Sequence, residues 1–233
     1  AEVLHFPAWE TLPHERLSPS PETVGRRLAL LRAVQHWDGS HPLIVTSSVR
    51  SALQPIAAGL TEAGVIELSA GDRGHDLEGV TRRLVELAYH RVDMVSRRGE
   101  FAVRGGILDV FPPAADHPYR VDFFGDEVDQ IRAFSVADQR SLPGEVATVP
   151  LLPSRELLLT PDVRETLAHE LTHALQDQYF DLGKFDDASS GTQTAYRALV
   201  EADAMRVEDA YVDTLNDADQ KAIDPARTEQ VGA

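Results

Sequence analysis

The spacing of hydrophobic residues predicts an α/β arrangement for the first part of this chain. Residues 1–20 are proline-rich and are expected to be irregular. Ser20 and Pro21 suit the cap and the first turn of a helix. The apolar, β-branched run over 42–48 is typical of a buried strand, and residues 49–60 favour a second helix.

The hydrophobic period changes to two after an amphipathic helix predicted over residues 76–89. Residues 101–111 alternate around a glycine pair, which predicts two short strands or one bent strand. Residues 119–134 alternate around Gly125 and predict a hairpin. Together these segments predict a small α+β unit that follows the α/β start.

The last third of the chain is expected to be helical. A connector rich in proline and leucine, over 141–160, leads to a helix expected from Thr160-Pro161 to about residue 178. An acidic loop over 180–194 and a second helix over about 195–215 follow. The polar tail from Asn216 is expected to fray.

These patterns define the predicted fold class and its boundaries. We expect an α/β fold with an inserted α+β unit, followed by a mainly α-helical C-terminal segment that carries an HExxH helix. The predicted divisions are a truncated α/β domain, an inserted α+β domain, a connector and a helical segment, over residues 1–70, 71–140, 141–164 and 165–233.

Composition narrows the possible functions. The chain has 233 residues and a formal net charge of -16, which argues against broad binding to a nucleic-acid backbone. Residues 165–233 carry 15 acidic and 5 basic residues, a net charge of -10. The absence of cysteine excludes a thiol nucleophile and a cysteine-ligated zinc site. No apolar run reaches the roughly 18–20 residues of a membrane span, and the first residues do not resemble a signal peptide, so we expect a cytoplasmic location.

The strongest chemical signal is an HExxH pattern, His169-Glu170-Leu171-Thr172-His173, within the first C-terminal helix. Histidines four residues apart lie on one face of a helix and can share one metal ion. Glu170 lies close enough to accept a proton from a metal-bound water. The alternative is a buried helix whose two histidines are hydrogen-bonded and hold no metal.

A zinc site of this type needs a third protein ligand. Because no cysteine and no further suitable histidine follows, a carboxylate on the next helix is required, and Glu201 is the best candidate. Asp203 is a candidate for orienting an imidazole, and Glu208 is a less favoured third ligand. Tyr196 and Tyr211 are both possible oxyanion donors, and nothing selects between them.

The string LAHELTHALQDQYFDL, followed by ALVEADA, resembles a bacterial family of HExxH metallopeptidases of the gluzincin type. The resemblance covers about residues 165–215, with Ala202 where that family usually has glycine. Its implied activity is peptide hydrolysis at a single zinc ion. The implied zinc ligands are His169, His173 and Glu201, with Glu170 as catalytic base.

The first 164 residues resemble a different family. The strings FPAWETLPHERLSPSPETVGRRLALL, SRRGEFAVRGGILDVFPP and PYRVDFFGDEVDQIRAFSVADQRSL are similar to the N-terminal, UvrB-like region of the bacterial transcription-repair coupling factor family. That resemblance implies an inserted domain that docks onto the excision-repair protein UvrA, with contacts at Arg104, Arg120 and Phe124. If the strand is regular, Arg120 and Phe124 share a face. The alternative is a solvated strand face with Phe124 in the core.

Two functional hypotheses follow. The first is an interaction module for UvrA that carries a peptidase-like helical segment, and the second is a zinc-dependent peptidase with an accessory N-terminal module. The two resemblances meet between about Leu159 and Glu165, so we also consider a chimera. The sequence lacks a phosphate-binding GxxxxGK[ST] motif, which gives no support to ATP hydrolysis.

Overall fold

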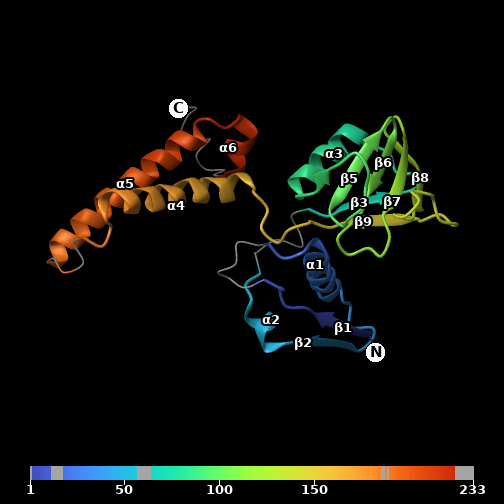
Figure 1. Ribbon diagram of the computed structural model, residues 1–233, viewed down its shortest axis with the longest axis horizontal. Coiled ribbons are helices and arrows are strands. Elements are labelled where there is room, and N and C mark those ends of the chain that lie inside the picture. The colour runs from blue at the N-terminus through green and yellow to red at the C-terminus, as the bar shows by residue number, and fades with distance from the viewer. Residues whose placement is uncertain (1, 12–17, 57–63, 185–186, 188, 224–233) are drawn as a thin grey trace. The chain divides into compact units, whose positions relative to one another are not determined.

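The computed structural model describes residues 2–11, 18–56, 64–184, 187 and 189–223 (Figure 1). The chain divides into two compact units, Ala1–Leu158 and Leu159–Ala233. We refer to them as the N-terminal unit and the helical unit. The division falls at the edge of the window in which the two sequence resemblances meet.

The N-terminal unit begins with a helix against a two-stranded parallel sheet (Figure 1). The predicted helix start is confirmed, because the Ser20 hydroxyl accepts a hydrogen bond from the Thr23 amide and Pro21 occupies the first turn. The elements are β1 (Glu2–Phe6), α1 (Pro21–Gln35), β2 (Leu43–Ser47) and α2 (Val49–Leu53).

Three expectations for this region are wrong. Residues 2–6 form a strand rather than irregular chain. β2 forms as predicted but is mostly exposed rather than buried, because only one strand pairs with it among the described residues. The second helix ends at Leu53 instead of continuing toward residue 60, since Pro55 pushes the preceding Gln54 into an extended conformation, with ψ of 135°. Part of the predicted helix lies outside the described residues.

A five-stranded sheet forms the centre of the N-terminal unit, in the order β4-β5-β6-β7-β8. β4 runs parallel to β5, and the other neighbours are antiparallel. The two short strands and the hairpin predicted around the glycines are confirmed, with Gly105 and Gly125 at positive φ in the turns. The strands are His90–Arg91, Glu100–Arg104, Ile107–Val110, Tyr119–Phe124 and Glu127–Ala133.

One face of this sheet is covered by α3 (Leu77–Glu86) and by an antiparallel pair, β3 (Ile66–Ser69) with β9 (Thr148–Leu151). The connector predicted over 141–160 thus contains a strand. Both partners of the pair lie outside the inserted domain predicted over 71–140, yet they share its core. Fully buried members of that core are Leu68, Leu84, Phe101, Leu108, Val110, Val121, Val128, Ile131, Val149 and Leu151.

The helical unit is an antiparallel pair, α4 (Pro161–Phe180) and α5 (Ser190–Val212), with α6 (Asp217–Ile223) against α4 (Figure 1). The predicted helical C-terminal segment is confirmed. α5 begins five residues earlier than expected, because Ser189 caps it by accepting from the Thr192 amide. The expected frayed tail is wrong for α6, which Asn216 caps through its side-chain oxygen. None of the described helices has the length and apolarity needed to cross a membrane.

Candidate functional sites

The five-stranded sheet presents a second face, opposite α3, that carries the three predicted contact residues. Val121 and Phe123 of β7 pack toward the α3 core, so Arg120 and Phe124 point to the opposite face. Arg104 lies on the same face, because cross-strand pairing links it through Ile107 to Asp122, between Arg120 and Phe124. We call this surface the outer face.

Phe124 is the most exposed apolar side chain of the outer face, at 82%. It ends β7 beside the Gly105-Gly106 turn, since the Phe123 amide donates to the Gly106 carbonyl at 2.8 Å. Arg104 is exposed at the same end of the sheet and donates from Nη2 to the Asp93 carbonyl at 2.6 Å. An exposed aromatic side chain and an exposed arginine at one end of a sheet are residue types enriched in protein-binding hot spots.

The guanidinium of Arg120, unlike that of Arg104, is bound to a buried carboxylate. Its Nε and Nη2 donate to the two carboxylate oxygens of Asp109 at 2.7 and 2.8 Å, and its Nη1 donates to the Gln139 carbonyl at 3.3 Å. The guanidinium also lies 4.9 Å from the centre of the Phe134 ring. The bond to Asp109 raises the pKa of Arg120. Because Asp109 is only 3% exposed, Arg120 neutralises a buried charge besides facing outward.

The helical unit brings two histidines and one glutamate together. The Nε2 atoms of His169 and His173 lie 3.0 Å apart, and Glu201 Oε2 of α5 lies 3.3 and 3.4 Å from them. One ligand atom from each residue lies within 4.8 Å of the others, a grouping that could hold a metal ion. Glu170 is exposed on α4, next to His169.

Each imidazole is oriented through its Nδ1 atom. His169 Nδ1 donates to Glu208 Oε2 at 2.8 Å, and His173 Nδ1 donates to Gln176 Oε1 at 2.9 Å. These bonds fix the hydrogen on Nδ1 and turn both Nε2 lone pairs toward one another. The Glu208 hydrogen bond raises the pKa of His169, and the charge of Glu201 adds to the effect.

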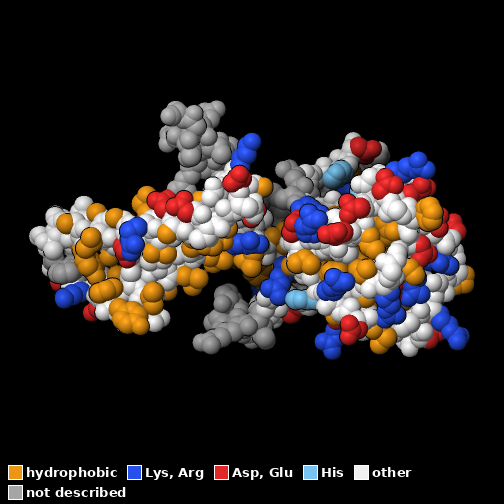
Figure 2. All heavy atoms as spheres, turned by 90° about the horizontal axis from the view of Figure 1, so that it is seen from above, with side chains coloured by type: hydrophobic (Ala, Val, Ile, Leu, Met, Phe, Trp, Pro, Cys, Tyr) orange, Lys and Arg blue, Asp and Glu red, His pale blue; other side chains and the backbone are white. Residues whose placement is uncertain are grey.

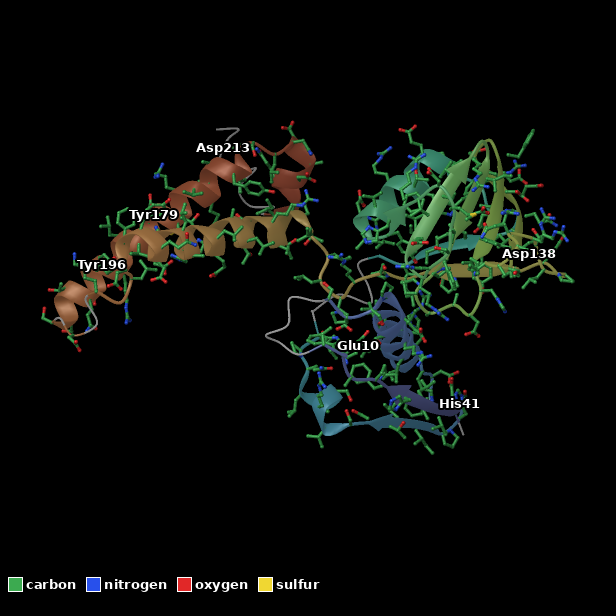
Figure 3. All side chains as sticks on the ribbon, viewed as in Figure 1. Glu10, His41, Asp138, Tyr179, Tyr196 and Asp213 are labelled. Carbon is green, nitrogen blue, oxygen red and sulfur yellow. The ribbon has the colours of Figure 1, made fainter. Side chains whose placement is uncertain are left out.

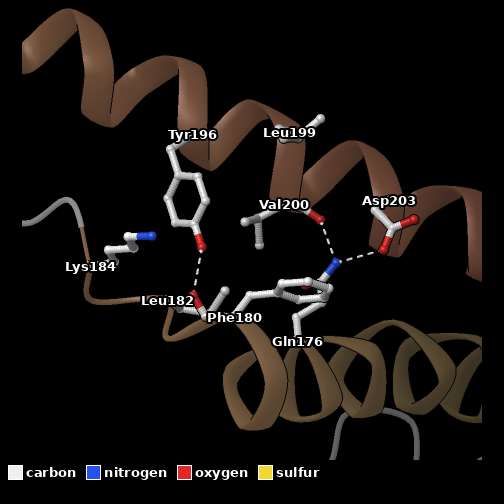
Figure 4. Close-up of a pocket in the computed structure, with 8 residues that line it drawn as sticks. All are labelled: Gln176, Phe180, Leu182, Lys184, Tyr196, Leu199, Val200 and Asp203. Carbon is white, nitrogen blue, oxygen red and sulfur yellow. Dashed lines mark hydrogen bonds between the residues drawn. The ribbon is translucent and has the colours of Figure 1, made fainter.

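The predicted orienting residue, Asp203, acts one step further away. Its Oδ2 accepts from Gln176 Nε2 at 3.0 Å, and the same nitrogen donates to the Val200 carbonyl at 3.1 Å (Figure 4). These two acceptors fix the amide so that Oε1 faces His173. Glu208, expected as a less favoured ligand, instead holds His169. The sequence signals for both roles are spacings: Gln176 is three residues after His173, and Glu208 is seven after Glu201.

Two cavities flank the α4–α5 contact. One of about 370 Å³ is mainly apolar and is lined by Gln176, Phe180 and Tyr196, among others (Figure 4). The other, of about 420 Å³, is lined by His173, Glu201 and again Tyr196. The Tyr196 hydroxyl donates to the Phe180 carbonyl at 3.4 Å, near the hairpin end of α5 (Figure 3). Tyr211 is half-buried near the other end of α5 and is not among the described residues that line either cavity.

Comparison with known proteins classifies the N-terminal unit. Residues 66–157 match the family model described as the UvrB interaction domain, a span that includes the five-stranded sheet, α3 and the β3–β9 pair. The N-terminal unit thus resembles the UvrB-interaction domain of the transcription-repair coupling factor.

Individual relatives give the extent of the likeness. A transcription-repair-coupling factor of Mycobacterium bovis is 56% identical over 171 residues, which cover 71% of this chain and 14% of the relative. The Bacillus subtilis protein is 33% identical over 177 residues, covering 74% and 14%, and that of Escherichia coli is 32% identical over 154 residues, covering 66% and 13%. The chain spans about 14% of the length of these relatives.

Proposed function

We propose that the N-terminal unit is a protein-interaction module of nucleotide-excision repair that docks a UvrA-type protein through the outer face. The single observation that carries this proposal is the match of residues 66–157 to the UvrB interaction domain. The 56% identity to a transcription-repair-coupling factor supports the repair context.

The three residues of the outer face make different contributions to the proposed contact with the partner. Phe124 supplies apolar area that is exposed in the free chain, so its burial by a partner is favourable. Arg104 supplies an exposed planar donor suited to a carboxylate of the partner. Arg120 offers the partner only the part of its guanidinium that Asp109 leaves free.

The test measures the affinity of the full chain for UvrA by calorimetry. Phe124→Ala and Arg104→Ala are each expected to weaken binding about tenfold or more, as hot-spot truncations do. Val85→Ala is the matched control, since Val85 is an exposed apolar residue of α3, on the other side of the sheet. Equal affinity of the Phe124→Ala variant and the parent chain would refute docking through this face.

A second candidate function belongs to the helical unit: we propose that His169, His173 and Glu201 hold one zinc ion. The supporting observation is the tautomer fixed by Glu208 and Gln176, because it leaves two Nε2 lone pairs 3.0 Å apart beside a carboxylate oxygen. The repulsion of two lone pairs at that distance is removed by a cation between them, which is either a proton on His169 or a metal ion. Two histidines and one glutamate are also a ligand set typical of catalytic zinc.

Peptide hydrolysis is the reaction that this ligand set would serve. Zinc bound there would supply a water of lowered pKa and would polarise a carbonyl group. Glu170 provides a carboxylate that can accept a proton beside His169, and Glu208 and Gln176 keep the two imidazoles in place. The cavity of about 420 Å³ lined by His173 and Glu201 provides space for a substrate.

The test measures zinc in the dialysed full chain. The parent is expected to retain about one zinc per chain, and His169→Ala/His173→Ala and Glu201→Gln are expected to lose it. Asp213→Asn, at the end of α5, is the matched control, because it removes a carboxylate about 18 Å along the helix from Glu201. A parent chain without zinc would refute the site.

Catalysis is tested separately from metal binding. Glu170→Gln is expected to retain zinc and to lose peptide hydrolysis, and a chelator is expected to remove hydrolysis in the parent. A zinc-loaded parent that cleaves no peptide in a mixed peptide library would refute the peptidase proposal and leave the metal site standing.

A further inference from the structure

Helix α4 carries an apolar face that its own unit does not cover. Leu167, Leu171, Leu175 and Tyr179 recur every four residues, so they form one stripe along the helix. Their exposed fractions are 39%, 65%, 55% and 75%. Figure 3 places Tyr179 on α4, and Figure 2 shows hydrophobic side chains at the surface of the helical unit. We call this surface the leucine stripe.

The leucine stripe does not face α5. The residues of α4 that are buried in the unit are Thr172 and Gln176, which lie about 100° and 140° around the helix from Leu171. Further exposed apolar side chains of the described part of this unit, among them Phe180, Leu199 and Met205, lie outside the stripe. An uncovered stripe of this length is typical of an interaction surface.

The net charge of the helical unit opposes self-association, and the position of the acidic residues on α4 limits this opposition. The segment 165–233 has a net charge of -10, so two copies of the helical unit repel each other through most of their surfaces. The acidic residues of α4 all lie outside the leucine stripe when projected around the helix axis. They are Asp162, Glu165, Glu170 and Asp177. The leucine stripe is therefore a face through which a second copy can approach without facing carboxylates of α4.

The stripe is also symmetric about Leu171. The residues three and four positions before Leu171 are the same as those at the same spacing after it. A two-fold axis through Leu171 would bring two antiparallel copies of α4 together with leucine against leucine and alanine beside it, a spacing that suits helix pairing. The matched pairs are Ala168 with Ala174 and Leu167 with Leu175.

The ends of the stripe are complementary in charge. No hydrogen bond or ion pair of the Arg164 side chain is present among the described residues. The last turn of α4 has no basic residue to offset its negative dipole end, and Asp177 and Asp181 lie there. Antiparallel pairing would place Arg164 of each copy beside the last turn of the other copy.

We propose that two copies of this chain associate through the leucine stripe, with α4 antiparallel to α4 of the second copy, so that the two α4–α5 hairpins form a four-helix assembly. The stripe from Arg164 to Tyr179 is about 22 Å long. A contact of that length falls at the small end of specific interfaces, so the dimer is reversible and forms in the micromolar range. The proposal is independent of zinc and of UvrA.

The first test is sedimentation velocity of the full chain over the micromolar concentration range. The parent is expected to pass from monomer to dimer, and Leu171→Glu is expected to weaken association about a hundredfold or more, because the two-fold axis places the change twice in the contact. Met205→Glu is the matched control, since Met205 is an exposed apolar residue of α5 outside the stripe. Circular dichroism checks that each variant keeps its helix content.

The second test uses the absence of cysteine from the chain to determine the orientation. Leu171→Cys is expected to form a disulfide-linked dimer under mild oxidation, because the two-fold axis brings the two positions together. Leu175→Cys is expected to stay unlinked, since antiparallel pairing separates its two copies by about 12 Å along the axis. Linkage of both variants would refute the antiparallel arrangement. A monomeric parent, or a dimer that survives Leu171→Glu, would refute the proposal.

Discussion

Removing the guanidinium of Arg120 is expected to destabilise the N-terminal unit before it affects any partner. The side chain of Asp109 is 4% exposed, and both of its oxygens accept from Arg120. Arg120→Ala leaves that carboxylate buried and without its cation. It also removes the contact with the Phe134 ring and the bond to the Gln139 carbonyl.

The magnitude follows from the burial of the pair. Breaking a buried ion pair from one side costs about 3–5 kcal/mol. Because the Arg120 side chain is 20% exposed, we expect the lower end, about 3 kcal/mol. For a unit of this size, that loss lowers the melting temperature by about 6–12 °C. Arg104→Ala removes one exposed hydrogen bond and is expected to cost less than about 1 kcal/mol.

The assay is urea unfolding of the full chain, followed by the near-ultraviolet signal of the N-terminal unit. The second variant, Arg120→Ala/Asp109→Asn, removes the uncompensated charge and is expected to recover about 1–2 kcal/mol of the loss. UvrA affinity is then compared at a temperature where each variant is folded. A cost of less than about 1 kcal/mol for Arg120→Ala would show that the buried Asp109 carboxylate does not depend on Arg120 for its stability. A second substitution that recovers nothing would show the same.

Three further predictions concern other contacts. Gly25→Ala is expected to destabilise the chain by about 1–3 kcal/mol in thermal unfolding, because the added Cβ would overlap the Pro113 carbonyl carbon. This cost exceeds the gain from the higher helix propensity of alanine. A rise in melting temperature would contradict this packing. Tyr89→Phe is expected to cost about 1 kcal/mol in urea unfolding, because the buried hydroxyl donates to the Leu152 carbonyl at 2.8 Å; an unchanged midpoint would contradict it. Glu208→Gln in metal-free protein is expected to lower the pKa of His169 in a nuclear magnetic resonance titration, since Glu208 raises that pKa. In the parent chain, the His169–Glu208 contact therefore stabilises the fold below a pH of about 6.5. This stabilisation is lost as the pH rises through the raised pKa of His169.

Local sequence signals predicted the elements whose stabilising contacts are local. The β5–β6 and β7–β8 hairpins follow from alternation around Gly105 and Gly125, because glycine allows the positive φ of each turn. The start of α1 follows from Ser20 and Pro21. These elements depend on residues within a few positions of one another.

Elements that depend on distant pairing escaped prediction. β9 lies in a stretch rich in proline and leucine, and it forms a strand because Ile66–Ser69 pairs with it from about 80 positions away. β1 pairs with β2 from about 40 positions away, with α1 between them. Local propensity carries no information about such pairing, so β1 fell within the segment predicted as irregular, 1–20, and β9 within the connector predicted over 141–160.

The candidate metal ligands were easier to predict from the sequence than the residues that orient them. The i, i+4 spacing of His169 and His173 follows from helix geometry, and α5 brings Glu201 against them. The seven-residue spacing places Glu201 and Glu208 on one face of α5, but it does not determine which carboxylate binds Nδ1 of His169. Asp203 was expected to bind an imidazole directly, but it reaches His173 only through Gln176. Zinc itself stays a prediction.

The open ribbon of β1 and β2 has a consequence for the handling of this protein. Parallel strands are normally covered on both faces, yet Val3, Ile44 and Val45 are 62%, 49% and 45% exposed. Within the described ranges no further strand pairs with β1 or β2, and an apolar ribbon with unpaired edges is a template for strand addition between molecules, which leads toward aggregation. A gatekeeping lysine at Ile44 would interrupt that template, so Ile44→Lys is the substitution to introduce when concentrated samples turn turbid.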